Sequence, residues 1–462
     1  MLQKLREWLV LILIIGLPFH AFLVTVGTRL LVGPGYAPLP LLAGWKEMLL
    51  GVVLMVAVVE IALRMRQLSG ASFQVPASPF RVDVADVCIV PLLILGIMLP
   101  GSWKLEAGSF LYGFKYTLFP LLLFIILRRV PWFTLSERSE SNGSERFSLL
   151  VARCSLLVGV VVAGYGILTL FLPESFFTWL GYSDLHSTYL PDGPIAAFQK
   201  IEGTGIRRIQ STFSGPNQLG VWLLIPLSMA VVQWQSGFPS PVGRGLGRGG
   251  RGILYLVFLL LFLALFFTFS RAAWMGAAVI AITTFLVARS PFRVLPWRLL
   301  GCWVVGLLGL AAIGIMVFPT IFARGASSSE HWRRPMEAIR TIAAHPLGLG
   351  LGSAGPAQNR LSDSCVFLAK GADTSWAKDR PNLCVFSGGA QIQPFDRACR
   401  CPFLPENWYL QVGVELGAVG LLLFVILTIV LIRSLLRTTD YKLQTNQSFP
   451  TSYFLLPFVG VS

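Results

Sequence analysis

The chain has 462 residues, of which 55% are hydrophobic and only 13% are charged, and its mean hydropathy is +0.70. Soluble globular proteins carry about 25% charged residues, so this composition excludes a disordered chain, a small secreted disulfide protein and a cytosolic enzyme of ordinary composition. It predicts an all-α, polytopic membrane protein, in which the formal net charge of +15 must be explained by where the charges lie.

Apolar runs long enough to cross a bilayer recur along the chain. Because a hydrocarbon core of about 30 Å needs about 20 helical residues, we expect a single integral membrane domain over residues 1–462, with spans near 8–32, 47–64, 85–100, 110–127, 149–172, 217–234, 253–269, 272–288, 299–318 and 409–432. The first run is too long for a signal peptide, and no small-residue cleavage site follows it. An apolar tail at 448–462 is either an eleventh helix cut short or an interfacial segment.

Basic residues mark every second connection between these spans. They begin with Lys4 and Arg6 and continue with Arg64 and Arg66; Arg128, Arg129, Arg138 and Arg146; Arg244, Arg248 and Arg251; Arg289, Arg293 and Arg298; Arg433, Arg437 and Lys442. The short connections in between carry little beyond Lys46, Lys104 and Arg271. The positive-inside rule therefore places the N-terminus in the cytoplasm. This topology accounts for most of the net charge, so we expect no nucleic-acid partner.

Two connections are longer than turning the chain requires. They run over 173–215 and 319–408, and the same topology places both on the extracytoplasmic side. Loops of this length are usually functional or disordered. Both contain aromatic residues, prolines and charges and neither is of low complexity, which favours a functional role.

Four cysteines lie in the second loop: Cys365, Cys384, Cys399 and Cys401. An even number of cysteines in an oxidising compartment predicts two disulfides, for which three pairings exist. The alternative is a zinc site, but the spacing lacks the paired C-x-x-C of zinc ribbons, and two cysteines separated by one residue are cramped for a zinc knuckle. We therefore favour disulfides and expect no metal.

Two stretches match the dinucleotide pattern G-x-G-x-x-G, at Gly350–Gly355 and at Gly245–Gly250. That pattern binds a nucleotide only between a strand and a helix of a βαβ unit. Neither stretch has this context, so we expect no nucleotide cofactor. The first stretch follows the amphipathic segment Glu330–Ala344 and is interpreted as a tight turn.

Polar residues gather in three segments where a span meets the outer side. Arg207–Gln218 leads into the sixth span, Thr268–Trp274 forms the turn between spans seven and eight, and Pro405–Gln411 enters span ten, which continues with Glu415, Gly417 and Gly420. Any one segment alone fits snorkelling arginines, interfacial aromatic residues or small residues at helix contacts. Three segments that combine cations, amides and a carboxylate at one face indicate a shared site.

The residue types suggest the chemistry of that site. Guanidinium groups form bidentate hydrogen bonds with phosphate, so Arg208 and Arg271 suit an anionic lipid diphosphate at the membrane surface. Glu406 suits a general base that activates an acceptor hydroxyl if partial burial raises its pKa.

The same segments resemble motifs of the bacterial O-antigen ligases and the related O-antigen polymerases. Arg208–Asn217 is similar to R-x-x-S/G-T-F-x-x-P-N, and Ser270–Trp274 to a Ser-Arg-small-small-Trp turn. His345–Gly350 resembles the His-Pro-Leu-x-Gly-x-Gly turn that ends a helix of the long outer loop. Asn407–Gly420 resembles the last motif, with Glu406 where the ligases carry histidine. The resemblance covers roughly 200–432.

This resemblance implies a GT-C-like bundle of about 10–11 spans and a metal-independent glycosyltransferase. Such enzymes move a glycan from a polyprenyl diphosphate carrier to a hydroxyl of a glycan, lipid or protein acceptor outside the bacterial cytoplasmic membrane. By the same resemblance, Arg208 and Arg271 hold the diphosphate and Glu406 is the base. The expected substrate-binding residues are Arg207, Asn217, Gln218, Ser270, Arg340, His345, Asn407, Tyr409 and Gln411.

A transporter of lipid-linked or small anionic substrates is the alternative from another class. Transporters show inverted repeats and broken helices near the middle of the membrane. The sequence shows no clear internal repeat, and its polar groups gather at one face, so we favour the enzyme.

Overall fold

The structure of the chain is a computed structural model that describes residues 2–69, 83–99, 107–127, 141–183, 194–201, 204–236, 247–287, 316, 325–368, 370–371, 373–378 and 381–444. Within these ranges the chain is mostly helical. Several predictions lie outside the described residues: the ninth span (299–318) apart from residue 316, the apolar tail (448–462), part of the second glycine-rich stretch, and Arg128, Arg129, Arg138, Arg244, Arg289, Arg293 and Arg298.

The helices at the expected spans are α1 (Leu2–Gly16), α2 (His20–Val32), α4 (Trp45–Ser69), α5 (Val84–Met98), α7 (Ala107–Gly113), α8 (Phe119–Leu127), α9 (Ser141–Leu168), α11 (Pro216–Ser236), α12 (Gly247–Phe267), α13 (Arg271–Val287) and α18 (Trp408–Gln444). In the described part of the chain, four helical segments have both the length and the hydropathy to cross a bilayer: Leu2–Val32, Ala107–Leu127, Leu150–Leu168 and Trp408–Ser434. The chain is therefore a membrane protein with several apolar helices, and the count of ten or more spans stays a prediction.

Local sequence explains two features of these helices. Pro18 has no N–H to donate, and the first span passes through a short 3-10 turn (Leu17–Phe19) between α1 and α2. At the start of α5, the Asp83 carboxylate accepts a hydrogen bond from the Asp86 amide, and the Asp86 carboxylate accepts one from the Asp83 amide. This reciprocal capping box satisfies amides that the first helical turn leaves without partners.

The helices pack into two groups, each with its own apolar core. One core joins α9, α11, α12 and α13 around Val162, Leu223 and Leu261. The other joins α5, α8 and α18 around Leu92 and Leu416. Gly159 of α9 lets the backbones approach closely, as is common between membrane helices, since an added methyl group there would lie 2.6 Å from Cβ of Pro226 on α11.

Arg6 has a different place from the one that the charge pattern suggested. Because α1 begins at Leu2, Arg6 lies inside the helix and is fully buried, and it forms an ion pair with Glu60 of α4. A buried charge needs a partner of opposite sign. Arg6 therefore ties α1 to α4 rather than serving as an exposed basic anchor.

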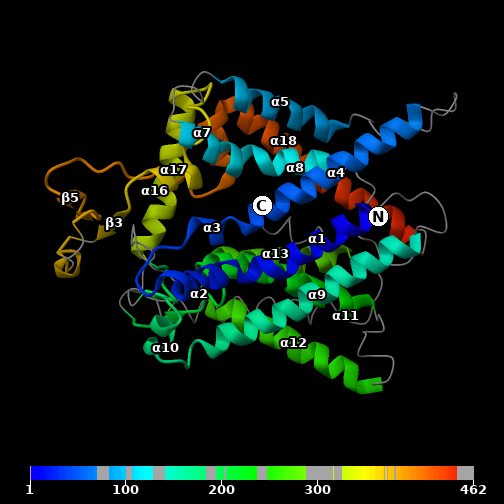
Figure 1. Cartoon of the computed structure of the whole chain (residues 1–462), viewed down its shortest axis with the longest axis horizontal. Coiled ribbons are helices and arrows are strands. Elements are labelled where there is room, and N and C mark those ends of the chain that lie inside the picture. The colour runs from blue at the N-terminus through cyan, green and yellow to red at the C-terminus, as the bar shows by residue number, and fades with distance from the viewer. Residues whose placement is uncertain are drawn as a thin grey trace.

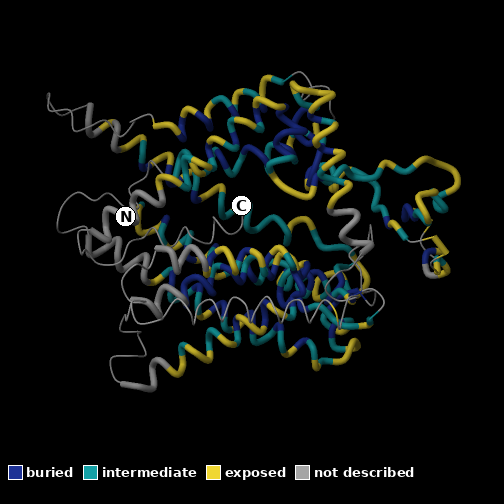
Figure 2. The backbone as a smooth tube through the Cα atoms, turned by 180° about the vertical axis from the view of Figure 1, so that it is seen from behind, coloured by how far each residue is buried: buried dark blue, intermediate teal, exposed yellow. Residues whose placement is uncertain are grey.

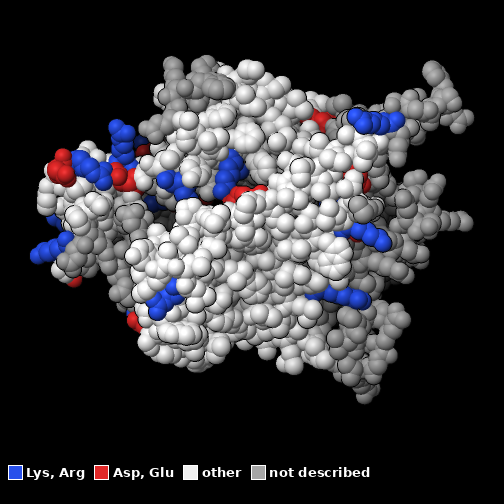
Figure 3. All heavy atoms as spheres, viewed as in Figure 1, with Lys and Arg blue, Asp and Glu red and all other residues white. Residues whose placement is uncertain are grey.

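The surface has the character of a membrane protein. Figure 2 shows exposed residues along the outer sides of the helices, and many of them are large and apolar, such as Leu30, Met55 and Leu422. Figure 3 shows a broad uncharged area on one face, with described charged side chains on both sides of it and one group of basic and acidic side chains near the middle of the view. Such an uncharged, apolar area is compatible with contact to lipid chains, because it exposes no charge to hydrocarbon.

The described parts of both long loops lie at the same end of the bundle, opposite the N-terminal end of α1 (Figure 1). The first loop contains α10 (Glu174–Trp179) and two short antiparallel strands, β1 (Gln199–Lys200) and β2 (Arg207–Arg208). The second contains α16 (Gly325–Ala344), α17 (Gly355–Leu361) and a three-stranded sheet of order β3-β4-β5, formed by β3 (Cys365–Leu368), β4 (Cys384–Ser387) and β5 (Ala390–Gln393). The β3–β4 pair is parallel and the β4–β5 pair is antiparallel.

Helix α18 is broken at Gly417, where φ is 77° and ψ is −174°. The turn that follows α16 enters the break. The Ala418 amide donates to the Pro346 carbonyl at 2.9 Å, and the Leu349 amide donates to the Val414 carbonyl at 2.8 Å. The stretch Gly350–Gly355 forms the tight continuation of this turn. The break therefore docks the second outer loop onto α18.

Replacing Gly417 by alanine is expected to lower the free energy of unfolding by at least about 2 kcal/mol. The positive φ disfavours any side chain, and an added methyl group would overlap the backbone of Pro346–Gly348. Thermal unfolding of the detergent-solubilised protein measures the effect. Gly164→Ala is the matched control, because Gly164 lies within α9 and its added methyl group has nothing within 4 Å; equal losses of stability would contradict the docking role.

Candidate functional site

The first two polar segments meet through Arg208. Its Nε donates to the Thr268 carbonyl at 3.0 Å, and its Nη2 donates to Oδ1 of Asn217 at 2.8 Å. Its Nη1 donates to Oε1 of Gln199 on β1 at 3.2 Å. This one guanidinium group thus joins β2, the start of α11 and the corner between α12 and α13.

Arg207, the preceding residue on β2, makes different contacts. Its guanidinium donates to the Leu172 carbonyl at 2.8 Å and to Oε1 of Glu174 at 3.2 Å, and it lies 4.4 Å from the ring centroid of Phe198. Neighbouring side chains on a strand point to opposite faces, which separates the contacts of the two arginines. Arg207 therefore links α10 to the two-stranded sheet. Its contacts lie within the first loop and not at the turn between α12 and α13.

The corner between α12 and α13 is tightly built. Ser270 is buried, and its amide donates a hydrogen bond to Oγ1 of Thr268 at 3.2 Å. The Trp274 ring stacks on Phe266 with centroids 5.6 Å apart, and its Nε1 donates to the Leu265 carbonyl at 3.1 Å. These contacts fix the position of Arg271, which is half-buried at the first residue of α13.

Arg271 therefore stands where two sources of positive potential coincide. Its guanidinium carries a full charge, and the first turn of α13 presents amides whose dipoles favour an anion. On α11, Gly220 leaves room for this corner: a methyl group there would lie 3.2 Å from Cβ of Ser270 and 2.8 Å from Cβ of Ala273. The arrangement suits recognition of a phosphate or diphosphate group.

Backbone strain gathers in the three polar segments. In the described part of the chain, the residues other than glycine with positive φ are Ser211 (φ 53°), Phe269 (φ 49°) and Glu406 (φ 71°). One lies in each segment. Such conformations cost energy and persist where the surrounding structure imposes them, commonly at functional sites. The segments thus share a property that their sequences do not reveal.

The third segment begins at Glu406. Its Oε1 accepts a hydrogen bond from Nη1 of Arg334 on α16 at 2.8 Å, within an ion pair of which both side chains are partly exposed. The next residue, Asn407, caps α18, since its Oδ1 accepts the Leu410 amide at 2.8 Å. Tyr409 packs against Phe424, with ring centroids 5.4 Å apart. Glu406 therefore sits between the start of α18 and the amphipathic helix of the second loop.

A buried polar network lies one turn further into α18. Oε2 of Glu415 accepts a hydrogen bond from Oγ1 of Thr117 at 2.6 Å, and its Oε1 accepts the Gly352 amide at 3.1 Å. Nε2 of Gln411 donates to Oγ1 of Thr117 at 3.2 Å. Thr117 belongs to a π-helical turn (Phe114–Leu118), a local irregularity often found at functional positions. Gln411 thus lies below the surface, and Thr117 was not among the expected site residues.

The other expected site residues lie on the surface. Arg340 and His345 are exposed at the C-terminal end of α16, and Asn217 and Gln218 are exposed at the start of α11. Gln218 lines a polar cavity that also borders the second loop. The sequence could not predict this cavity, because the Asn, Ser and Arg residues that line it are scattered along the chain without a recognisable spacing.

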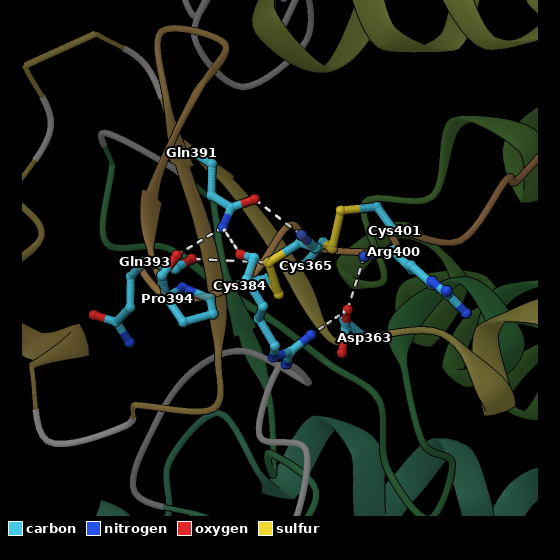
Figure 4. A network of polar contacts seen from close by, with 10 residues as sticks. Asp363, Cys365, Cys384, Gln391, Gln393, Pro394, Arg400 and Cys401 are labelled. Carbon is cyan, nitrogen blue, oxygen red and sulfur yellow. Dashed lines mark hydrogen bonds and ion pairs between the residues drawn. A yellow bond between two sulfur atoms is a disulfide. The ribbon is translucent and has the colours of Figure 1, made fainter.

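The second loop is cross-linked by two disulfides, Cys365–Cys401 and Cys384–Cys399. This is one of the three pairings that the sequence left open. Around them, Oδ2 of Asp363 accepts hydrogen bonds from Nη1 of Arg397 at 2.8 Å and from the Arg400 amide at 2.7 Å (Figure 4). The contact with Arg397 holds the pKa of Asp363 below its usual range. This contact therefore stabilises the folded loop at pH values above the ordinary pKa of an aspartate, and the stabilisation is lost as the pH falls through the lowered pKa.

Asp363, Cys384 and Cys399 are close enough together to suggest a metal site, with their candidate ligand atoms within 4.8 Å of one another. Zinc binds cysteine as the thiolate. Here both sulfur atoms are joined in a disulfide, so this group does not offer the ligand set of a zinc site.

Replacing Cys365 and Cys401 together by serine is expected to open the second loop to proteolysis. The chain-entropy model assigns about 4 kcal/mol to a cross-link of this separation and about 3 kcal/mol to the shorter one. The sequence separations are 36 for Cys365–Cys401 and 15 for Cys384–Cys399. Mass mapping after limited proteolysis, without reductant, measures both the pairing and the protection; unchanged protection in the double variant would show that the loop is held by other contacts.

Comparison with known proteins adds one finding. Residues 256–369 match the family model described as O-antigen ligase. The matched region runs from within α12 through the Thr268–Trp274 corner, α16 and the His345–Gly350 turn to the end of β3. No curated protein and no solved structure matches the chain.

Proposed function

We propose that this chain moves a glycan from a polyprenyl diphosphate carrier to an acceptor hydroxyl, and the match of residues 256–369 to the O-antigen ligase family model supports this proposal. The observation that carries this proposal is the corner at Thr268–Arg271. It is held by Arg208, has a strained residue at Phe269 and places Arg271 at the amino end of a helix. Such a corner is suited to the charge of a diphosphate leaving group.

In the proposed reaction, the acceptor oxygen forms a bond to the anomeric carbon of the donor sugar while the bond from that carbon to the carrier diphosphate breaks. The diphosphate leaves with the bonding electron pair. Arg271 and the amides of α13 stabilise the negative charge that develops on it, which is where preorganised donors contribute most. Arg208 positions this corner through its contacts with Thr268 and Asn217.

The proton of the acceptor hydroxyl goes to Glu406 in this proposal. A carboxylate accepts a proton during glycosyl transfer in many glycosidases, so its presence where the ligases carry histidine is compatible with the same step. The contact with Arg334 and the positive φ hold Glu406 in one orientation. Arg334 is a positioning residue in this scheme.

The proposed site faces the extracytoplasmic side of a bacterial cytoplasmic membrane, with the N-terminus in the cytoplasm. We place both long loops on that side, together with the polar segments at the starts of α11, α13 and α18. The proposed partners are membrane lipids, the lipid-linked donor and a glycan, lipid or protein acceptor. No metal or nucleotide takes part in the proposed step.

One observation bears on transport as the second candidate. Helix α18 is broken at Gly417, and broken helices occur at transporter substrate sites. Here the backbone of the turn at Pro346–Gly350 fills the break with hydrogen bonds. This packing favours a structural role for the break and supports transfer over transport.

The two functions separate in one experiment. Full-length protein in lipid nanodiscs is incubated with a polyprenyl-diphosphate-linked glycan and a panel of glycan, lipid and peptide acceptors. Transfer predicts release of the free carrier diphosphate together with a mass increase of one acceptor. Movement of the intact donor across vesicles, with neither release nor product, would overturn the proposal.

A further inference from the structure

A second polar site lies beside the proposed donor corner. It is a cavity of about 620 Å³ between the helix bundle and the cross-linked second loop. Tyr116 and Gln218 border it from the bundle, Asn359 and Arg360 from α17, and Asn382 and Arg397 from the cross-linked loop. Cavities of roughly 300–1,000 Å³ are typical of sites for small ligands.

The lining fits a sugar. Small-molecule sites are usually lined mostly by apolar groups, whereas this one presents amides, hydroxyls and guanidinium groups. Amides and hydroxyls both donate and accept hydrogen bonds, as recognition of a sugar hydroxyl requires. An aromatic wall is also present, since Tyr116 stacks on Tyr112 with centroids 6.4 Å apart.

The charges at the cavity favour an acidic ligand. Arg397 is paired with Asp363 at 2.8 Å, but Arg360 has no hydrogen bond or ion pair with any residue that the structure describes. Its charge also acts repulsively on a second cation, Lys46 of α4. Figure 3 shows basic side chains over the region of α17. Like charges repel each other, and an anion bound at Arg360 would reduce that repulsion.

The cavity is held in place on both sides. Two disulfides and the Asp363–Arg397 contact fix the loop wall. On the bundle side, Gln218 follows directly after Asn217, the residue that accepts a hydrogen bond from Arg208. A sugar chain whose end lies at the donor corner therefore has a neighbouring polar space to enter.

We propose that this cavity binds a sugar of the glycan substrate that carries a carboxylate, with Arg360 pairing that carboxylate and Asn359 and Asn382 recognising hydroxyls. The proposal rests on the proposed function and specifies the substrate class. Arg360 determines specificity and takes no part in bond making or breaking.

The test measures binding rather than transfer. Full-length protein in nanodiscs is titrated calorimetrically with three acidic oligosaccharides, made of galacturonate, glucuronate or sialate, and with their methyl esters, which are neutral. We expect at least one acid to bind more tightly than its ester. Arg360→Ala should weaken binding of that acid by about tenfold, the loss expected for one charge-assisted contact, and Arg360→Lys should retain part of it. Arg333→Ala, an exposed arginine of α16 paired with Glu337, is the matched control and should bind as the unaltered protein does.

Each other outcome has a defined meaning. Equal binding of acid and ester would overturn the acidic specificity and leave a neutral-sugar site. Absence of binding by all three acids, or unchanged binding by Arg360→Ala, would overturn the proposed site. Arg271→Ala should bind the acid normally while losing transfer, so acid binding without any transfer activity in the unaltered protein would contradict the proposed function and not this site. The protein's own glycan, assayed with the same Arg360→Ala variant, distinguishes a donor from an acceptor by which Michaelis constant rises.

Discussion

Replacing Arg271 by alanine is expected to lower the rate of glycan transfer by about 100- to 1,000-fold, with little change in thermal stability. The guanidinium lies at the first residue of α13, where its charge adds to that of the helix terminus. The diphosphate gains negative charge as it leaves, so the loss should appear mainly in kcat. Release of carrier diphosphate under saturating donor measures it.

Two variants sharpen this prediction. Arg271→Lys keeps the charge but loses the planar fork that binds phosphate, so its rate should fall between those of the unaltered protein and Arg271→Ala. Arg333→Ala removes an exposed charge on α16 and should keep the rate of the unaltered protein. Transfer by Arg271→Ala at the normal rate would exclude the corner as the diphosphate site.

Replacing Arg208 is expected to have a different effect from replacing Arg271. Its guanidinium holds the Thr268 carbonyl and Asn217 together, so Arg208→Ala should lose both transfer and stability. A fall in the unfolding temperature of this variant, absent in Arg271→Ala, would separate a residue that builds the corner from one that faces the substrate.

Replacing Glu406 by glutamine is expected to lower transfer by roughly 100-fold or more, the usual contribution of a general base. Glutamine keeps the size and the hydrogen bond acceptor for Arg334 but cannot take the proton. Glu406→His should keep much of the activity, because imidazole is also a base. Since imidazole ordinarily titrates at higher pH than a carboxyl group, the acidic limb of the rate profile should move to higher pH in this variant.

The ion pair with Arg334 allows a stricter control. If Glu406 acts only by holding α16 against α18, then Arg334→Ala breaks the same contact and should cost as much transfer as Glu406→Gln. We expect the smaller loss for Arg334→Ala, since the base itself remains. Equal losses, together with an unshifted pH profile for Glu406→His, would return Glu406 to a structural role.

Local patterns predicted the parts of this protein that depend on neighbouring residues. Apolar runs predicted the membrane helices, because the length of such a run and its lack of charge are properties of one segment. The segments around Arg208, Arg271 and Glu406 could be identified for the same reason, since each motif lies within a dozen residues. These motifs predicted a resemblance to the O-antigen ligases, and residues 256–369 match that family model.

The contacts between distant segments were beyond such patterns. Arg6 resembled a basic anchor until its pairing with Glu60, 54 residues away, placed it inside the bundle. No local pattern marks Thr117, because its partner Glu415 lies 298 positions away. Nothing in the local sequence distinguishes a threonine that faces lipid from one that binds a buried carboxylate.

By itself, the sequence determined that this chain is a helical membrane protein, and it predicted that most of the excess positive charge lies in the cytoplasmic connections between spans. Only the tertiary structure decided that Arg207 and Arg208 contact different neighbours, which cysteines pair, that α18 breaks where the second loop packs, and that Arg360 lines a polar cavity. The physical reason is that composition and hydropathy add up along the chain, whereas hydrogen bonds, disulfides and cavities depend on which distant surfaces the packing brings together.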